Sequence, residues 1–185
     1  IDHNLKGARN MGAVRRTGRL IGPLEAIDKI WANKPKLDVL SVGPRTEMEL
    51  FHLCGYGFDP RRVRGLDLVS SSPMIDIGDM HQMPYEDNRF DLIICGWVLV
   101  YSDDRARAMR EFVRVTKPGG VIAVGNTYIP QEQRGDNSVG VLSVAEAKVD
   151  TYLDYVRESV DQVYFRHGAP DNQEGRVIFI FDVKK

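Results

Sequence analysis

Short apolar runs alternate with amphipathic stretches along most of this 185-residue chain. The apolar runs are rich in Val, Ile and Leu, which is typical of strands buried on both faces of a sheet. We predict strands at Val39–Val42, Val63–Leu68, Met74–Ile77, Phe90–Cys95, Val121–Val124, Val160–Arg166 and Val177–Val183. The amphipathic stretches predict helices over Pro23–Asn33 and Thr46–Leu53, after an N-cap at Ser102, and from Ser143, which has capping-box spacing to Glu146.

The stretch Leu37–Glu47 organises the expected fold, because a buried strand runs straight into a tight turn. Gly43 allows the backbone to turn sharply, and Pro44 suits the first position of the following helix. A strand, a glycine turn and a helix N-terminus together direct free backbone N–H groups at whatever lies above the sheet.

The connection between the second and third strands is too short for a helix. Parallel neighbours usually need a crossover of about a dozen residues or more, and few residues separate Leu68 from Met74. We therefore expect a loop crossover and a short third strand at the edge of the sheet. The turn Pro170–Gly175 joins the last two strands and predicts an antiparallel hairpin.

This alternation predicts an α/β fold: a doubly wound, mostly parallel sheet with a C-terminal antiparallel hairpin and a shortened crossover after strand 2. Residues 23–185 are expected to form a single domain. Residues 1–22 are rich in Gly and Arg with poor periodicity, so we predict a flexible N-terminal arm. The arm is either a frayed terminus or a lid whose arginines can pair with an anionic group.

The composition limits the functional classes to which this chain can belong. The net charge of −1 gives no electrostatic case for binding nucleic acid or an anionic membrane. Cys54 and Cys95 have no metal-ligand or disulfide spacing, so no metal is expected and both are interpreted as small buried hydrophobes. No signal peptide or membrane span is expected, and the cytoplasm is the default location. The first residue is Ile1 rather than Met, which leaves open whether residues upstream are missing.

Two carboxylates follow neighbouring strands of the predicted sheet. Asp67 ends the second strand and Asp79 follows the third. In open parallel sheets, ligands bind beyond the carboxyl ends of the strands, where the strand order reverses. A carboxylate at the first position can accept hydrogen bonds from both hydroxyls of a ribose, and one at the second can accept from an exocyclic amine.

The run from Ile77 to Gly125, IGDMHQMPYEDNRFDLIICGWVLVYSDDRARAMREFVRVTKPGGVIAVG, resembles class I S-adenosylmethionine-dependent methyltransferases of the type 11-like group. The resemblance covers Leu37–Gly125, and the final hairpin matches the family's antiparallel last strand. It implies a Rossmann-like fold with S-adenosylmethionine as cofactor. The cofactor-binding residues that it implies are Gly43 and Thr46 in the first motif, Asp67 with Leu68 at the ribose, Asp79 and Met80 at the adenine, and Gly96 and Trp97 after strand four.

The first motif departs from the family pattern of an acid followed by a glycine-rich loop. Ser41 replaces the acid, Arg45 the second glycine and Glu47 the third. One arrangement compatible with these side chains pairs Glu47 with the ammonium group of the methionine moiety and Arg45 with its carboxylate.

By the same resemblance we expect methyl transfer to a small-molecule or glycan-like acceptor, with the oligomeric state open. Tyr101, at the position of a frequent family histidine, is the first candidate for a catalytic base, followed by His81. The alternative is a catalytically degenerate domain that binds a nucleotide-like ligand or a protein partner. A nicotinamide-dependent enzyme is disfavoured because the G-x-G-x-x-G fingerprint is absent at Gly43.

Overall fold

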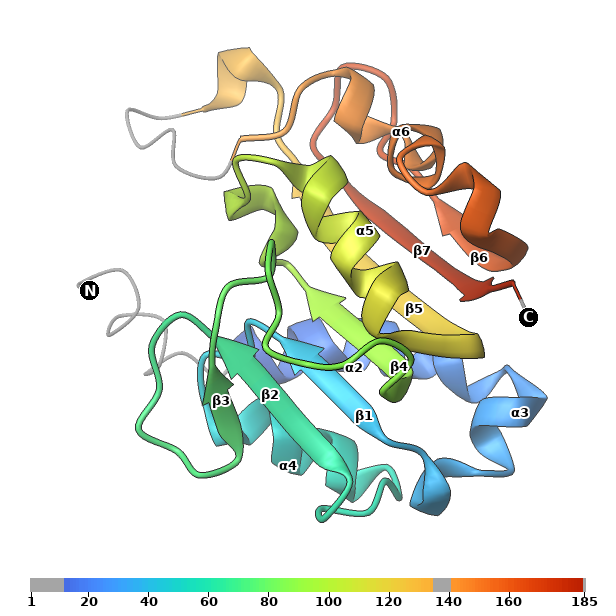
Figure 1. Cartoon of the computed structure of the whole chain (residues 1–185). Coiled ribbons are helices and arrows are strands. Elements are labelled where there is room, and N and C mark those ends of the chain that lie inside the picture. The colour runs from blue at the N-terminus through green and yellow to red at the C-terminus, as the bar shows by residue number, and fades with distance from the viewer. Residues whose placement is uncertain (1–11, 135–140, 185) are drawn as a thin grey trace.

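A mixed sheet with the strand order β3-β2-β1-β4-β5-β7-β6 forms the centre of the computed structural model (Figure 1). The structure describes residues 12–134 and 141–184. The strands are β1 Val39–Val42, β2 Val63–Asp67, β3 Ile75–Ile77, β4 Phe90–Gly96, β5 Thr116–Tyr128, β6 Val160–His167 and β7 Gly175–Val183. Strands β1 to β5 are parallel, whereas β7 is antiparallel to both β5 and β6. The predicted fold class is therefore confirmed.

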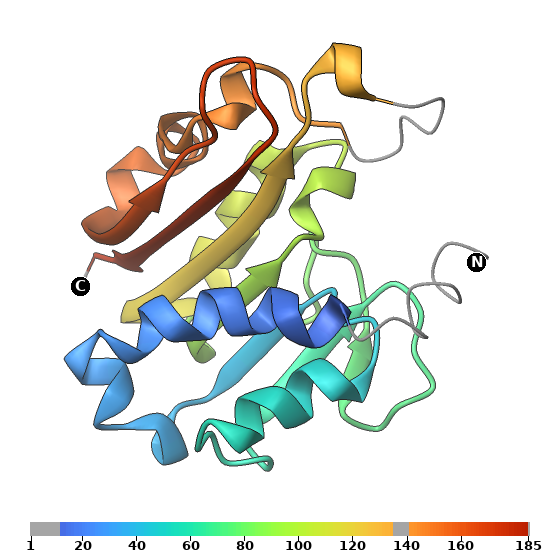
Figure 2. The same cartoon turned by 180° about the vertical axis from the view of Figure 1, so that it is seen from behind.

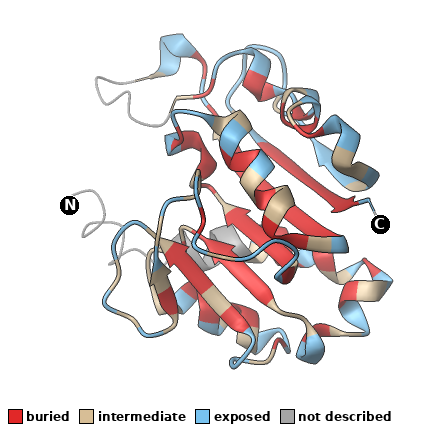
Figure 3. Cartoon of the chain, in the orientation of Figure 1, coloured by how far each residue is buried: buried red, intermediate tan, exposed pale blue. Residues whose placement is uncertain are grey.

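Helices cover both faces of the sheet. Helices α5 (Arg105–Val115) and α6 (Val149–Asp154) lie on the face toward the viewer in Figure 1. Helices α2 (Gly12–Glu25) and α4 (Glu47–Gly55) lie on the opposite face, seen in Figure 2. Figure 3 shows that burial is concentrated in the central strands and in the helix sides that meet them.

Successive strand residues contribute to two hydrophobic clusters, one on each face of the sheet. Leu40 and Ile93 belong to the cluster that includes the apolar side chains of α5 and α6. Val39 and Leu92 belong to the cluster that includes those of α2 and α4. This alternation follows from the two-residue side-chain period of a strand covered on both faces.

The link between β2 and β3 contains no helix, and β3 lies at the edge of the sheet, as predicted. Two serine hydroxyls stabilise the turn: Ser70 Oγ accepts a hydrogen bond from the N–H of Ser72 at 3.0 Å, and Ser72 Oγ accepts from Met74 at 3.1 Å. Such side-chain turns replace the backbone hydrogen bonds that a crossover helix would supply.

The turn after β1 is longer than predicted. Gly43 and Arg45 have φ values of +66° and +58°, in the left-handed region. These angles are incompatible with a right-handed helix, so Pro44 is not a helical residue, and α4 begins at Glu47 with Thr46 as its N-cap residue, one residue after the predicted start.

The prediction of an arm through residue 22 is wrong over the part that the structure describes. Helix α2 begins at Gly12, and its residues Leu20, Ile21 and Leu24 are almost completely buried. A separate short helix, α3 (Asp28–Trp31), follows, in place of one helix over 23–33. Residues 1–11 lie outside the described residues.

Several boundaries in the second half also differ from the prediction. The N-cap of α5 is Asp104, whose Oδ1 accepts a hydrogen bond from the Arg107 N–H at 2.9 Å, rather than Ser102. Strand β5 runs to Tyr128, because its last residues pair with β7 instead of entering a loop. The capping-box contacts of Ser143 and Glu146 form, but they open a single 3-10 turn, and α6 starts only at Val149.

A partly buried ion pair joins α3 to the hairpin. Lys29 Nζ lies 2.7 Å from Asp182 Oδ2, and the same carboxylate accepts hydrogen bonds from Tyr164 Oη at 2.9 Å and the Gln162 N–H at 2.8 Å. Burial alone would raise the pKa of Asp182, but the bonds from Lys29, Gln162 and Tyr164 hold it below its ordinary value.

Replacing Gly43 with Ala should destabilise the fold. An added Cβ would lie 2.5 Å from Val98 Cγ2, and the left-handed φ is unfavourable for alanine. We expect the free energy of unfolding to fall by about 2 to 4 kcal/mol in urea denaturation. Gly22→Ala is the matched control, because its Cβ meets nothing within 4 Å in α2 and should leave stability unchanged or higher. Equal losses in both variants would contradict this interpretation.

Asp182→Asn should lower stability at neutral pH by about 1 to 3 kcal/mol, because it removes the charge that pairs with the half-exposed Lys29. Since the folded-state pKa of Asp182 is depressed, its contribution is present above the unfolded-state pKa and is lost as pH falls through the folded value. The stability difference between wild type and variant should therefore shrink below about pH 4. Urea titrations across pH, with the exposed Asp171→Asn as control, test this; a difference that does not change with pH would refute it.

Candidate functional site

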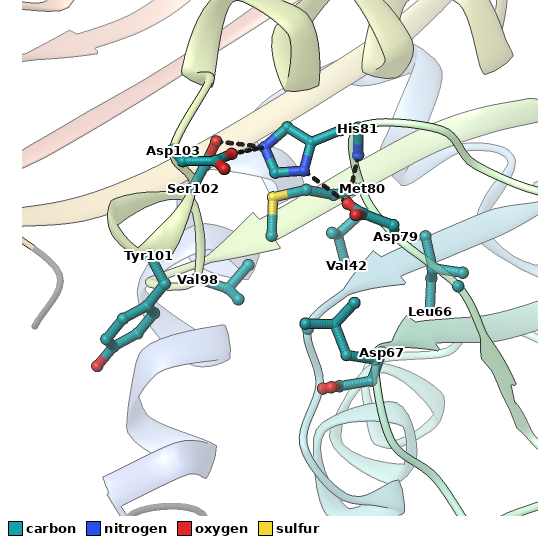
Figure 4. A pocket seen from close by; sticks show the side chains of 13 residues that line it. Val42, Leu66, Asp67, Asp79, Met80, His81, Val98, Tyr101, Ser102 and Asp103 are labelled. Atoms are coloured by element: carbon teal, nitrogen blue, oxygen red, sulfur yellow. Dashed lines mark hydrogen bonds and ion pairs between the residues drawn. The ribbon is translucent and has the colours of Figure 1, made fainter.

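A cavity of about 320 Å³ lies beyond the carboxyl ends of β1, β2 and β3 (Figure 4). This is the crevice where the strand order reverses between β1 and β4. Its volume is in the range of small-molecule sites. Its lining comes from four segments of the chain: Val42 and Gly43; Leu66, Asp67 and Leu68; Gly78, Asp79, Met80 and His81; and Val98, Tyr101, Ser102 and Asp103.

The structure thus brings together seven of the residues predicted from the sequence: Gly43, Asp67, Leu68, Asp79, Met80, His81 and Tyr101. The two carboxylates come from the ends of neighbouring strands, since Asp67 pairs with Ile77 in the sheet and Asp79 follows two residues later. Aliphatic side chains of Val42, Leu66 and Val98 line the space around them. A mainly apolar wall with a few carboxylates is suited to a flat organic ligand that has polar edges.

Asp67 is held in place by the loop that follows β1. The backbone N–H of Arg45 donates a hydrogen bond to Asp67 Oδ2 at 3.2 Å. The left-handed conformation of Arg45 accompanies this bond. The loop after β1 and the end of β2 are therefore linked through one oxygen of the carboxylate, and this bond does not involve Oδ1.

Asp79 is the first member of a hydrogen-bonded chain across the cavity. Asp79 Oδ1 lies 2.8 Å from the backbone nitrogen of His81 and 2.6 Å from His81 Nδ1. On the other side of the ring, His81 Nε2 lies 2.7 Å from Ser102 Oγ and 3.3 Å from Asp103 Oδ1. The His81 backbone N–H, the His81 ring and the charge of Arg107 hold the pKa of Asp79 below its ordinary value, against the smaller effect of burial. The carboxylate therefore remains an acceptor at neutral pH.

The remaining predicted residues are outside the lining of this cavity: Arg45, Thr46, Glu47, Gly96 and Trp97. Glu47 lies in the first turn of α4, where its own backbone N–H and the Ser72 hydroxyl lower the pKa of its carboxyl. The Trp97 side chain packs in the cluster on the α2 face, and its Nε1 donates to Thr127 Oγ1 at 2.7 Å.

Ser102 and Val98 are lining residues that sequence reasoning did not identify as ligand contacts. The sequence predicts Ser102 as a helix cap, but its hydroxyl contacts His81, 21 residues earlier in the chain. No local pattern carries such a pairing. Val98 packs against the position of Gly43, a contact that depends on two loops meeting across the sheet.

Within residues 12–134 and 141–184, no group of three or more His, Cys, Asp and Glu side chains is arranged to hold a metal ion. In the same residues, every helix is too short or too polar to cross a membrane.

The sequence profile for "Methyltransferase domain" matches residues 41–124. This range begins in β1, ends in β5 and includes every residue that lines the cavity. The match therefore covers the candidate site as well as the parallel part of the sheet.

Individual relatives are methyltransferases by name. A demethylmenaquinone methyltransferase of Renibacterium salmoninarum is 30% identical over 136 residues, which cover 65% of this chain and 52% of that protein. An uncharacterized methyltransferase of Schizosaccharomyces pombe is 41% identical over 46 residues, 25% of this chain and 16% of that protein. The chain thus spans about half, or less, of the length of these curated relatives.

Solved structures of the same fold include a putative sarcosine dimethylglycine methyltransferase from Galdieria sulphuraria, with a TM-score of 0.63 and 13% identity over 92% of this chain and 86% of that one. The [4+2]-cyclase SpnF has a TM-score of 0.60 and 17% identity, with 85% of this chain and 80% of that one covered. At these identities the likeness shows the fold alone. The profile match over the cavity segments and the named relatives, together with the fold of these solved structures, support a class I methyltransferase family for this chain.

Proposed function

We propose that this protein transfers a methyl group from S-adenosylmethionine to a small-molecule or glycan-like acceptor. The observation that carries the proposal is the presence of Asp67 and Asp79 in one cavity at the carboxyl ends of adjacent strands, with aliphatic side chains around them. A nucleoside presents a diol at one side and an exocyclic amine at the other, with a flat apolar ring between. The lining offers a matching group for each of these parts.

The residues of the cavity fit the adenosine part of the cofactor. We assign the ribose hydroxyls to Asp67 and the exocyclic amine to Asp79, because an ionised carboxylate accepts hydrogen bonds from both kinds of donor. Leu68 and Met80 supply apolar surface for the ring. Gly43 leaves backbone exposed in the cavity at a position where a Cβ would collide with Val98. When bound, the cofactor supplies the activated methyl group, and the protein supplies position and surroundings.

The loop after β1 is proposed to hold the methionine part. Thr46 and Glu47 begin α4, and a helix N-terminus favours an anionic group such as a carboxylate. Arg45 is assigned to that carboxylate and Glu47 to the ammonium group, as opposite charges require. Gly96, the last residue of β4, and Trp97, which follows it, are assigned to the cofactor through their backbone, since the Trp97 ring packs elsewhere.

The acceptor is proposed to enter beside Tyr101. This side chain lines the cavity and is 43% exposed, so its hydroxyl can meet a second molecule. A phenol at this place can accept or orient a proton of the acceptor. His81 differs from Tyr101, because partners lie within hydrogen-bonding distance of both of its ring nitrogens.

One observation favours a second candidate function. Two positions that are glycine in the family pattern carry the charged side chains of Arg45 and Glu47. If these side chains prevent the methionine part from binding, the domain is catalytically degenerate and binds a nucleotide-like ligand or a protein partner.

Ligand titration separates the two candidates. We expect S-adenosylmethionine and S-adenosylhomocysteine to raise the melting temperature by several degrees, because a ligand at 100 times its Kd adds about 2.7 kcal/mol of stability. NAD should give no shift. Thermal unfolding followed by fluorescence, with calorimetry for the Kd, measures both effects. If none of the three compounds shifts the transition, the degenerate candidate replaces the enzyme.

Asp67→Ala should weaken S-adenosylhomocysteine binding at least tenfold, since a hydrogen bond to a charged group contributes about 1.5 to 3 kcal/mol. Because Asp67 also accepts the Arg45 N–H, Asp67→Asn is measured beside it; the amide oxygen retains that bond while the charge is lost. Asp171→Ala, in the exposed turn before β7, is the matched control and should bind as wild type does. Unchanged affinity in both Asp67 variants would remove the ribose assignment.

A further inference from the structure

His81 connects two segments that border the cavity from different parts of the fold. Its Nδ1 faces Asp79 in the loop after β3, and its Nε2 faces Ser102 in the turn before α5 (Figure 4). The backbone is fixed as well, because Arg107 Nε donates to the His81 carbonyl oxygen at 2.9 Å. The side chain is only 16% exposed. The ring is therefore held at both ends.

The bond to Asp79 is compatible with both charge states of the ring. In the neutral tautomer with the proton on Nδ1, the Nε2 lone pair accepts the Ser102 hydroxyl proton. In the imidazolium, Nε2–H donates toward Ser102 Oγ and Asp103 Oδ1 instead. Nδ1–H donates to Asp79 in both states. The charged groups around the ring are thus the carboxylates of Asp79 and Asp103 and the guanidinium of Arg107.

Asp79 needs this support more than a buried carboxylate would. Its side chain is 54% exposed. The entropy cost of fixing one rotamer therefore weakens ligand binding, unless the protein already holds the side chain in that rotamer. The backbone N–H of His81 supplies one restraint and the ring supplies a second, and both use the oxygen Oδ1. Neither bond involves Oδ2.

We propose that His81 is a positioning residue, which uses Ser102 as its anchor to orient Asp79 so that Oδ2 reads the exocyclic amine of the adenine. This inference rests on the proposed function, because it assigns the amine to Asp79. It goes beyond that function by identifying His81 and Ser102 as determinants of nucleobase specificity. If His81 only linked the two segments structurally, its removal would change the stability of the protein and would change the affinity for every ligand equally.

The test compares two ligands that differ only at the position read by Asp79. S-Adenosylhomocysteine carries the exocyclic amine, and the purine-riboside analogue of S-adenosylhomocysteine carries only a hydrogen atom there. Calorimetry gives the Kd of each ligand for wild type, His81→Ala, His81→Asn, Ser102→Ala and the control His167→Ala, in the exposed end of β6. The readout is the ratio of the two Kd values.

Wild type and His167→Ala should prefer the adenosyl ligand at least tenfold. His81→Ala should reduce this ratio at least fivefold, through weaker binding of the adenosyl ligand alone. His81→Asn should recover part of the preference, because its amide nitrogen stands close to where Nδ1 was and can donate to Asp79. Ser102→Ala, which keeps the ring but removes its anchor, should reduce the ratio about twofold or more.

Several outcomes would overturn the inference. If a folded His81→Ala keeps the wild-type ratio, or loses affinity for both ligands equally, His81 does not position Asp79 for base reading. If His81→Ala does not fold, an unchanged ratio in Ser102→Ala has the same consequence. A wild type that binds both ligands equally refutes the amine assignment while leaving the proposed function intact. A wild type that binds neither ligand refutes the proposed function itself.

Discussion

The contact between Gly43 and Val98 determines the shape of the cavity. Gly43 directly follows β1 and Val98 lies just after β4, so the contact joins the two strands between which the strand order reverses. The Val98 side chain lies where a Cβ on residue 43 would be, 2.5 Å from Cγ2. Because the glycine has no side chain, the two loops close against each other and form part of the cavity wall. The carboxylates of Asp67 and Asp79 then face the same space from the next two strands.

Much of this arrangement could be predicted from the sequence, because it depends on local patterns. Short apolar runs specified the strands, and the parallel pairing of β1 to β5 places their carboxyl ends at one edge. The short link between Leu68 and Met74 was enough to predict the missing helix and the edge position of β3. The convergence of Asp67 and Asp79 follows from these two facts alone.

The features that were not predicted depend on contacts between distant segments. Helix α2 contains Pro23 and several glycines, which argue against a helix, and it is stabilised by burial of Leu20 and Leu24 against the sheet and α4. The direction of the Trp97 ring depends on its φ of +61°, which no sequence pattern encodes. That angle turns the ring toward the α2 face, where Gly125 has no side chain to obstruct it.

The first loop lacks two glycines of the family pattern, yet a cavity lies beside it. Glycines in such a loop allow close approach of the backbone, and here the neighbouring strand provides part of that space instead. A Cβ on Gly65 in β2 would lie 2.7 Å from Pro44 Cγ, so the loop packs down on β2 at a position that only glycine permits. The left-handed Arg45 costs about 1 to 2 kcal/mol, which its N–H offsets in part by bonding Asp67. Because Arg45 is not among the lining residues, its side chain leaves the cavity beside Asp67 and Asp79 open.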